Sequence, residues 1–228
     1  MPDVRDGLPK HVRKFVFDHF RERSTPPVLE DVMRRFSLGR DEAYRVLQDL
    51  ESARHVRLVP GTQRILMAFP FSAVATPFRV TAEKGRRYFA NCAWDAIALH
   101  ATLEEDVRID SHYHDCATDL GFELRAGQVR EASHPDILVH ISIPAAHWWD
   151  DIVNTCSNHM VFFMSRDHLS DWRSVHPGAG EALTVEQTHR LGFPIYRDKM
   201  DLDYARPPKE QLVAHFESMG LTSDFWRL

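Results

Sequence analysis

The spacing of apolar residues changes once along this 228-residue chain, and that change limits the folds open to it. Over the first 50 residues, apolar side chains recur every three or four positions, as on one face of a helix. Beyond residue 80, several short segments alternate apolar and polar residues, which is typical of strands with one buried face. The sequence therefore predicts an α+β chain in two parts, divided near residue 80.

The first part, residues 1–80, is predicted to hold three helices and a hairpin. Helical spacing covers residues 8–23, 28–36 and 41–52, with Asp41 expected as the N-cap of the third helix. The segment HVRLVPGTQRILMAF then predicts two strands joined at Pro60-Gly61. Three helices followed by a hairpin is the order of a winged helix, so a winged-helix-like module is expected here.

A winged helix often binds DNA through its third helix, but the charges on this one are mixed. Arg40, Arg45 and Arg54 are placed where they could contact phosphate. Acidic residues crowd the same helix, and the whole chain has a formal charge of −5, both of which oppose phosphate binding. We therefore expect no specific binding to nucleic acid.

The second part, residues 81–228, is predicted to be a mixed, mostly antiparallel sheet with flanking helices. The segment FPFSAVATPFRVTAEKGRRYFA indicates a linker and one strand, and a helix is expected from Tyr88 to Leu99. Strand patterns occur in DVRIDSHYHD, in FELRAGQVREA with a turn at Ala126-Gly127, in DILVHISIP, and in the apolar run MVFFMS. Helices are expected near 184–191 and near 209–219, the latter in a C-terminal helical extension.

The three cysteines are too few and odd in number for a disulfide scaffold, which indicates a reducing compartment with free thiol. No apolar run approaches the roughly 18 residues that a membrane span needs. The polar start MPDVRDGLPKHVRK does not resemble a secretory signal. A cytoplasmic protein without membrane contact is expected.

Cys92 and Asp95 are three positions apart in a segment of helical character, which places them about one turn from each other. An acid beside a thiol can hold or pass the thiol proton. A carboxylate alone raises the pKa of the thiol and so does not favour a simple thiolate nucleophile. From the residues alone, a buried structural thiol and a solvated acid remain the alternative interpretation.

Two further cysteines have neighbours that suggest a site. Cys156 lies where the polar segment NTCSN meets the apolar run MVFF, so it could line a pocket or be a half-buried structural thiol. Cys116 follows His112 and His114, which could supply zinc ligands. A closed zinc site needs a fourth ligand that the pattern does not provide. Phosphate-loop, dinucleotide-binding and serine-nucleophile motifs are absent from the sequence.

Several segments together resemble the alkylmercury lyase (MerB) family. The segments FPFSAVATPFRV, FANCAWDAIAL, HDCATDLGFEL, NTCSNHMVFFMS, WRSVHPG and LTVEQTHRLG occur in the order and at the approximate spacing of that family, over about residues 25–195. The resemblance implies that Cys92 and Cys156 bind mercury and that Asp95 handles the proton. It implies a structural role for Cys116, which we expect to be a small buried side chain. The tail from about Tyr196 onward has no counterpart that we can place.

The resemblance implies a lyase that detoxifies organomercurials and contributes to mercury resistance. Mercury is soft and prefers thiolates, so two cysteines are the expected ligands of the substrate and product metal, with Asp95 beside them. The carbon–mercury bond would be cleaved by protonolysis, with Asp95 as the general acid. No organic cofactor is expected. External thiols would release Hg(II), and a mercuric reductase is the expected partner that receives it.

Two other functions stay open from the sequence. The thiols could hold a soft metal ion in a binding protein or a metal-responsive regulator whose winged-helix module contacts DNA. The intact Asp95 favours the enzyme, because a sensor has no need of a proton donor. A lyase-like fold could also serve another thiol-based reaction.

Overall fold

The computed structural model describes residues 7–176, 178 and 180–228 of the chain. Residues 1–6, which belong to the predicted N-terminal module and begin the segment MPDVRDGLPKHVRK, lie outside the described residues. The same holds for Pro177 of the WRSVHPG segment. Within the described residues, no helix combines the length and the hydropathy required for a membrane crossing.

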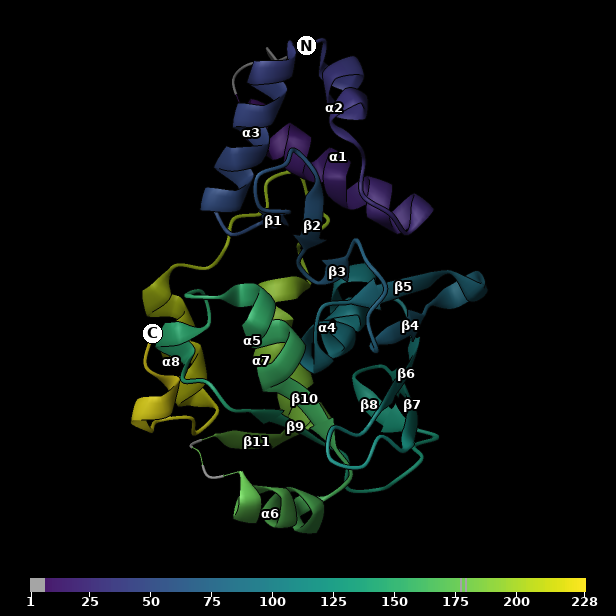
Figure 1. The fold of residues 1–228 in the computed structure, drawn as a ribbon, viewed down its shortest axis with the longest axis vertical. Coiled ribbons are helices and arrows are strands. Elements are labelled where there is room, and N and C mark those ends of the chain that lie inside the picture. The colour runs from purple at the N-terminus through teal and green to yellow at the C-terminus, as the bar shows by residue number, and fades with distance from the viewer. Residues whose placement is uncertain (1–6, 177, 179) are drawn as a thin grey trace.

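Three helices and a hairpin form one end of the molecule, as the sequence predicts (Figure 1). They are α1 (Leu8–Arg23), α2 (Leu29–Phe36), α3 (Arg40–Ser52), β1 (Val56–Leu58) and β2 (Ile65–Ala68). The apolar faces meet in a shared core that includes Val16, Val32 and Leu47. The predicted order of elements is confirmed, while the winged-helix character of the module stays a prediction.

The start of α3 differs from the prediction. Gly39 is the N-cap, and Asp41 lies within the first turn instead of capping the helix. An acidic residue is favourable there as well, because the first turn of a helix carries partial positive charge.

An eight-stranded antiparallel sheet begins with the hairpin and continues through the middle of the chain. Its order is β1-β2-β3-β5-β4-β6-β7-β8. The further strands are β3 (Phe71–Ser72), β4 (Arg79–Thr81), β5 (Arg87–Ala90), β6 (Val107–His112), β7 (Asp119–Arg125) and β8 (Gln128–Arg130), with a 3-10 turn η1 (Glu83–Gly85). Pairing of β3 with β5 carries the sheet across residue 80. The two-part division near that residue stays a prediction.

A second sheet has three strands, with β9 (Leu138–Ile141) between β10 (Met160–Phe163) and β11 (Glu181–Thr184). Both neighbours are antiparallel to β9. All four residues of β9 and all four of β10 are buried. The first four residues of the run MVFFMS therefore form a buried strand, as predicted for this run.

The central helix of the second part is α4 (Ala93–Leu103), ten of whose eleven residues are buried. It packs against α7 (Val185–Tyr196) and against strands of both sheets. A helix that is apolar all round is suited to such a position. Gly192 permits close packing here, since a Cβ at that position would lie 2.5 Å from Nε1 of Trp94.

The predicted start of this helix at Tyr88 was wrong. Tyr88 and Phe89 belong to β5, whose residues pair with β3 and β4, and the helix begins only at Ala93 with Cys92 as its N-cap. The segment YFANCAWDAIAL is mostly apolar, and such a run does not distinguish a buried strand from a buried helix. Likewise, residues 69–90 hold three short strands, where a linker and one strand were expected.

The remaining elements are η2 (Ala145–His147), α5 (Ile152–His159), α6 (Arg166–Val175), α8 (Lys209–Ser218) and η3 (Asp224–Trp226). Neither α6 nor β11 was predicted. The helices α7 and α8 were predicted, and Thr184 caps α7 by accepting a hydrogen bond from the amide of Gln187 at 3.1 Å.

The chain after α7 returns to the N-terminal helices before it reaches α8 (Figure 1). Arg13 of α1 is buried and donates hydrogen bonds to carbonyl oxygens of this segment, at 2.6 Å to Lys199 and 3.3 Å to Leu202. Lys10 forms an ion pair with Asp203 at 2.7 Å. These contacts fasten the tail to α1 and place it along one side of a cavity.

Candidate active site

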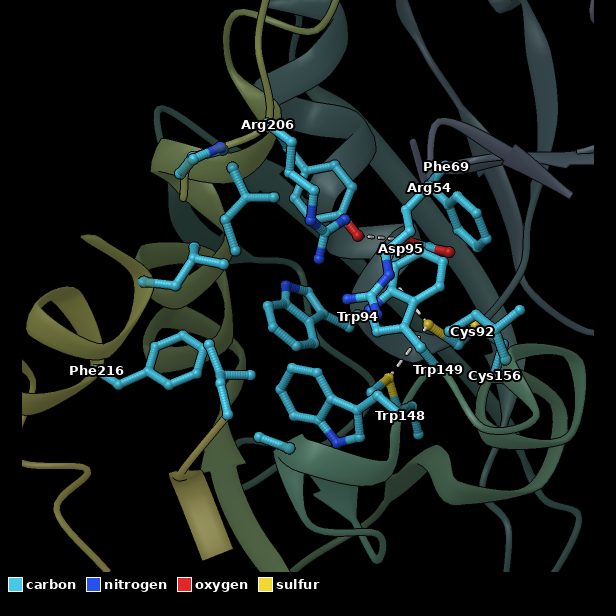
Figure 2. A pocket seen from close by; sticks show the side chains of 18 of the residues that line it. Arg54, Phe69, Cys92, Trp94, Asp95, Trp148, Trp149, Cys156, Arg206 and Phe216 are labelled. Atoms are coloured by element: carbon cyan, nitrogen blue, oxygen red, sulfur yellow. Dashed lines mark hydrogen bonds between the residues drawn. The ribbon is translucent and has the colours of Figure 1, made fainter. Parts of the chain in front are cut away.

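Cys92, Asp95 and Cys156 meet in the wall of a cavity of about 440 Å³ (Figure 2). The two sulfur atoms and a carboxylate oxygen of Asp95 all lie within 4.8 Å of one another. All three side chains are buried, with exposed fractions of 1% for Cys92 and 2% for Asp95 and Cys156. The fold thus joins the nearby pair Cys92 and Asp95 to a cysteine that lies far along the chain.

Cys92 occupies the N-cap of α4, and its sulfur accepts a hydrogen bond from the backbone amide of Asp95 at 3.3 Å. The partial positive charge at a helix N-terminus stabilises a thiolate. Asp95 lies in the first turn of the same helix. The two side chains are therefore adjacent and about one turn apart, as the spacing predicts, but Cys92 lies at the N-cap and not within the helix.

Cys156 lies on α5, which ends where β10 begins. Asp151 caps this helix by accepting a hydrogen bond from the amide of Asn154 at 3.1 Å. At the start of β10, Met160 has its sulfur 3.9 Å from that of Cys92. The site thus collects three sulfur atoms, from α4, α5 and β10.

Asp95 accepts two hydrogen bonds that fix its carboxyl group. The side-chain amide of Asn91 donates to Oδ2 at 2.8 Å, and the hydroxyl of Tyr196 donates to Oδ1 at 2.8 Å. Burial raises the pKa of Asp95 to about 6, although both hydrogen bonds and the charge of Lys199 lower it. The carboxyl group can therefore exchange a proton near neutral pH.

Both thiols of the pair have raised pKa values. Burial is the largest cause for Cys92, followed by its contact with Cys156 and the charge of Asp95. For Cys156, the hydrogen bond with Cys92 lowers the pKa, but burial and the charge of Asp95 outweigh it. The pair is thus protonated in the absence of a metal, and binding of a soft cation must displace protons.

Tyr196 and Lys199 were not identified from the sequence. Lys199 is buried, donates to the backbone carbonyl of Phe69 at 2.9 Å, and lies 5.0 Å from the ring centroid of Tyr196. Burial lowers the pKa of Lys199, and Arg206 lowers it further, while Asp95 raises it. Both residues lie at or beyond the end of the segments that carry the family resemblance, and no spacing rule links them to Asp95.

The cavity has mostly apolar and aromatic walls. Trp94 and Trp148 meet edge to face with their ring centroids 5.2 Å apart. The tail contributes Leu212, Phe216 and Leu228, so residues from the end of the chain face the thiols. The charged residues in the lining are Arg54, Asp95, Arg206 and Lys209.

Cys116 does not belong to this site, and its side chain is exposed. The expectation of a small buried side chain was wrong, because Cys116 lies in the turn between β6 and β7, next to Ala117 with φ of 55°. The zinc ligands considered for it, His112 and His114, do not gather around it.

Cys116 instead lies near Asp115 and His168, with potential ligand atoms within 4.8 Å of one another. Oδ2 of Asp115 and Nδ1 of His168 are 2.5 Å apart.

Comparisons with known proteins connect this arrangement to one family. A family model described as alkylmercury lyase matches residues 71–197, which include the thiol pair and Asp95. Alkylmercury lyases of Bacillus cereus and Clostridium butyricum are each 26% identical over 167 residues, covering 72% of this chain and 71% of theirs. A crystal structure described as the mercury-bound form of MerB2 has the same fold, with a TM-score of 0.67, 19% identity, and coverage of 88% of this chain and 93% of that one. Because the family model covers more than half of the chain, the protein belongs to the alkylmercury lyase family.

Proposed function

We propose that this protein cleaves the carbon–mercury bond of organomercurials by protonolysis, using Cys92, Cys156 and Asp95. The observation that carries the proposal is the meeting of two buried thiols and one buried acid within 4.8 Å, in the wall of an apolar cavity. The names of the related lyases agree with this chemistry.

The two thiols would bind the metal. Thiolate is the softest ligand that a protein offers, and mercury is a soft cation. As one cysteine sulfur binds the mercury of an incoming organomercury thiolate, the accompanying thiol leaves with a proton. The second cysteine then binds, and its proton passes to Asp95. The metal is finally held by Cys92 and Cys156 together.

Asp95 would deliver that proton to carbon. Electron donation from two sulfur atoms increases the negative charge on the carbon bound to mercury, so the carbon becomes a better proton acceptor. The proton from Asp95 forms the new carbon–hydrogen bond as the carbon–mercury bond breaks, and the hydrocarbon leaves. The carboxylate that remains is stabilised by the donors of Asn91 and Tyr196. Two thiol protons are used, one for the leaving thiol and one for the hydrocarbon.

The walls of the cavity fit this role. Tryptophan rings and aliphatic side chains around the thiols can bind the apolar organic group and limit the access of water. The protein's own side chains and an external thiol supply the ligands and the proton that the proposed reaction needs, so we propose that it proceeds without an organic cofactor.

Further parts of the proposal concern the surroundings of the protein. All three cysteines are free thiols, which supports a reducing, cytoplasmic location. The product Hg(II) would pass to small thiols and then to a mercuric reductase. On the N-terminal module, Arg40 pairs with Glu30 at 2.5 Å, and Arg54 lines the cavity. Both arrangements support the absence of specific DNA binding.

The test is benzene release from phenylmercury by the purified protein in excess thiol, followed by gas chromatography. We expect benzene to form with repeated turnover, and the Cys116→Ser variant to match the parent. Bound phenylmercury without benzene would contradict the proposal and indicate a soft-metal-binding protein instead.

A further inference from the structure

The charged residues that line the cavity do not match the charge of the chain. Three of the four, Arg54, Arg206 and Lys209, are cationic, and Asp95 is the single acid. The whole chain has a formal charge of −5. The cavity is therefore positively charged in a negatively charged molecule, and a positively charged cavity attracts anionic ligands.

Two of these cations are held against one aromatic ring. The guanidinium carbon of Arg54 lies 4.9 Å from the ring centroid of Trp149, and that of Arg206 lies 4.8 Å from the same centroid. Arg54 follows α3 in the N-terminal module, whereas Arg206 belongs to the tail. In Figure 2 both side chains extend toward the part of the cavity that holds Asp95 and the thiols.

Neither guanidinium has an acidic partner among the described residues. The ion pairs and hydrogen bonds found there include no contact between a carboxylate and Arg54 or Arg206, although many other arginines have one. Burial lowers the pKa of Arg206, and the charge of Arg54 adds to this effect. The two like charges therefore oppose each other, with Arg206 half-buried and Arg54 exposed to solvent.

The positive potential extends behind the arginines. Lys199 and Arg13 lie close enough to lower the pKa of His55 to about 3, after burial as the larger cause, and Arg206 contributes as well. His55 is thereby kept neutral. Contact with Trp149 neutralises neither charge, and an anionic ligand placed between the two cations would do so. Guanidinium groups bind carboxylates through paired hydrogen bonds.

We propose that Arg54 and Arg206 form a carboxylate-binding subsite in this cavity, so that the preferred mercury compounds carry a carboxylate. This inference rests on the proposed function, since it places the ligand beside the thiol pair. The carboxylate has two possible sources with the same chemistry. It belongs either to the organic group, as in a carboxyphenyl compound, or to the small thiol that accompanies the mercury.

The experiment compares 4-carboxyphenylmercury with phenylmercury, each in excess 2-mercaptoethanol, which is neutral, or mercaptoacetate, which carries a carboxylate. Rates of benzoate or benzene release give KM for the parent and for Arg54→Gln and Arg206→Gln. Arg206→Lys keeps the charge but loses the paired donors. Arg45→Gln, at an exposed position of α3, is the matched control for the loss of one positive charge.

We expect KM for the carboxylate-bearing compound to rise roughly tenfold to a hundredfold in Arg54→Gln and Arg206→Gln, as for loss of a charge-assisted contact. KM for phenylmercury with the neutral thiol should change less than about twofold. For the carboxylate-bearing compound, KM of Arg206→Lys should lie between those of the parent and Arg206→Gln, and KM of Arg45→Gln should equal that of the parent. If KM is lower for 4-carboxyphenylmercury than for phenylmercury in the neutral thiol, the bound carboxylate belongs to the organic group. If KM is lowered only by mercaptoacetate, the bound carboxylate belongs to the thiol that accompanies the mercury.

Equal KM values for all compounds in parent and variants would overturn the subsite. Equilibrium dialysis of the same mercury compounds against competing thiol provides a measurement that does not need turnover. A carboxylate preference in retention that Arg206→Gln abolishes supports the subsite even if no hydrocarbon forms, in which case only the proposed lyase activity fails. Equal retention of both compounds in every variant contradicts the subsite independently of activity.

Discussion

The two sides of the cavity differ in origin. The side with Cys92, Asp95 and Cys156 is built from α4 and α5, within the 71–197 segment that matches the family model. The other side takes Arg54 from the N-terminal module and Arg206 and Phe216 from the tail, all outside that segment. In the proposed mechanism the two thiols and Asp95 must keep a fixed mutual geometry, whereas the residues proposed to surround the organic group need only fit a substrate. Substitutions on the thiol side should therefore affect mercury binding and bond cleavage, whereas substitutions on the other side should affect the fit of the substrate.

The largest effect is expected from the thiols. Cys92→Ser or Cys156→Ser replaces a soft ligand by a hard one, so each variant should lose hydrocarbon release and retain Hg(II) much less firmly against a competing thiol. Mercury analysis after dialysis and gas chromatography of the product check both losses, with Cys116→Ser as the control. Retention like that of the parent in either variant would mean that the two thiols do not act as a pair.

Asp95→Asn should separate binding from cleavage. The amide keeps nearly the same volume and leaves both thiols, so the organomercurial should still bind, but the exchangeable proton is lost. General acid catalysis contributes roughly 10²–10⁴-fold, and hydrocarbon release should fall by that order. Bound mercury and released hydrocarbon are measured on the same sample. Normal release would remove Asp95 from the mechanism, and failure to bind would make it a ligand.

The tuning of Asp95 should be visible in the pH dependence of kcat/KM. In the proposed mechanism Asp95 must be ionised to accept the thiol proton, so the rate should rise with pH through the Asp95 pKa of about 6. Lys199 and Tyr196 both lower that pKa. In Lys199→Met and Tyr196→Phe the acidic limb should therefore move to higher pH, by up to about one unit. Lys14→Met is the control, and unshifted limbs in both test variants would contradict this account.

Phe216→Ala tests the tail side of the cavity. Phe216 is 2% exposed, and its ring centroid lies 5.7 Å from that of Trp226 and 6.3 Å from that of Trp148. Its truncation should cost about 3 kcal/mol of stability in urea unfolding, as for a buried aromatic residue. Because the thiol side is unchanged, kcat per folded molecule should stay within a few-fold of the parent. A loss of kcat as large as that expected for Asp95→Asn would contradict the different roles given to the two sides.

The smallest effect is expected at Cys116. Its exposed side chain leaves no cavity when shortened, so Cys116→Ala should change stability by no more than about 0.5 kcal/mol. Urea unfolding and turnover under saturating substrate check this. A loss of several kcal/mol would show that the thiol supports the turn between β6 and β7.

Much of the fold could be predicted because local patterns in this chain agree with their tertiary setting. The residues of α1 show one apolar face, and β6 alternates buried and exposed side chains, so each element is encoded by its own periodicity. The start of α4 could not be predicted in the same way. Residues 88–99 are all buried except the half-buried Phe89, in the strand part and in the helix part alike, and pairing with β3 and β4 makes the first of them a strand.

The candidate site was predictable only where residues match a motif. Cys92, Asp95 and Cys156 lie in segments that resemble the family, and the fold brings them together. Tyr196 contacts Asp95 from another helix, and Arg206 reaches Trp149 from the tail. Such contacts join residues that are far apart in the sequence, so they depend on the tertiary fold and cannot be predicted from the spacing of residues.

The hydrogen bonds from Arg13 to the returning segment join the first described helix to the last third of the chain. One side of the substrate cavity is therefore secured by a residue near the opposite terminus. If α1 detaches, the backbone carbonyl groups of Lys199, Asp201 and Leu202 lose their donor, and the tail is no longer held beside the thiols. Local unfolding of the amino-terminal end and opening of the cavity then become a single event. By thermodynamic linkage, any compound that binds between the tail and the thiols should also protect α1 from unfolding.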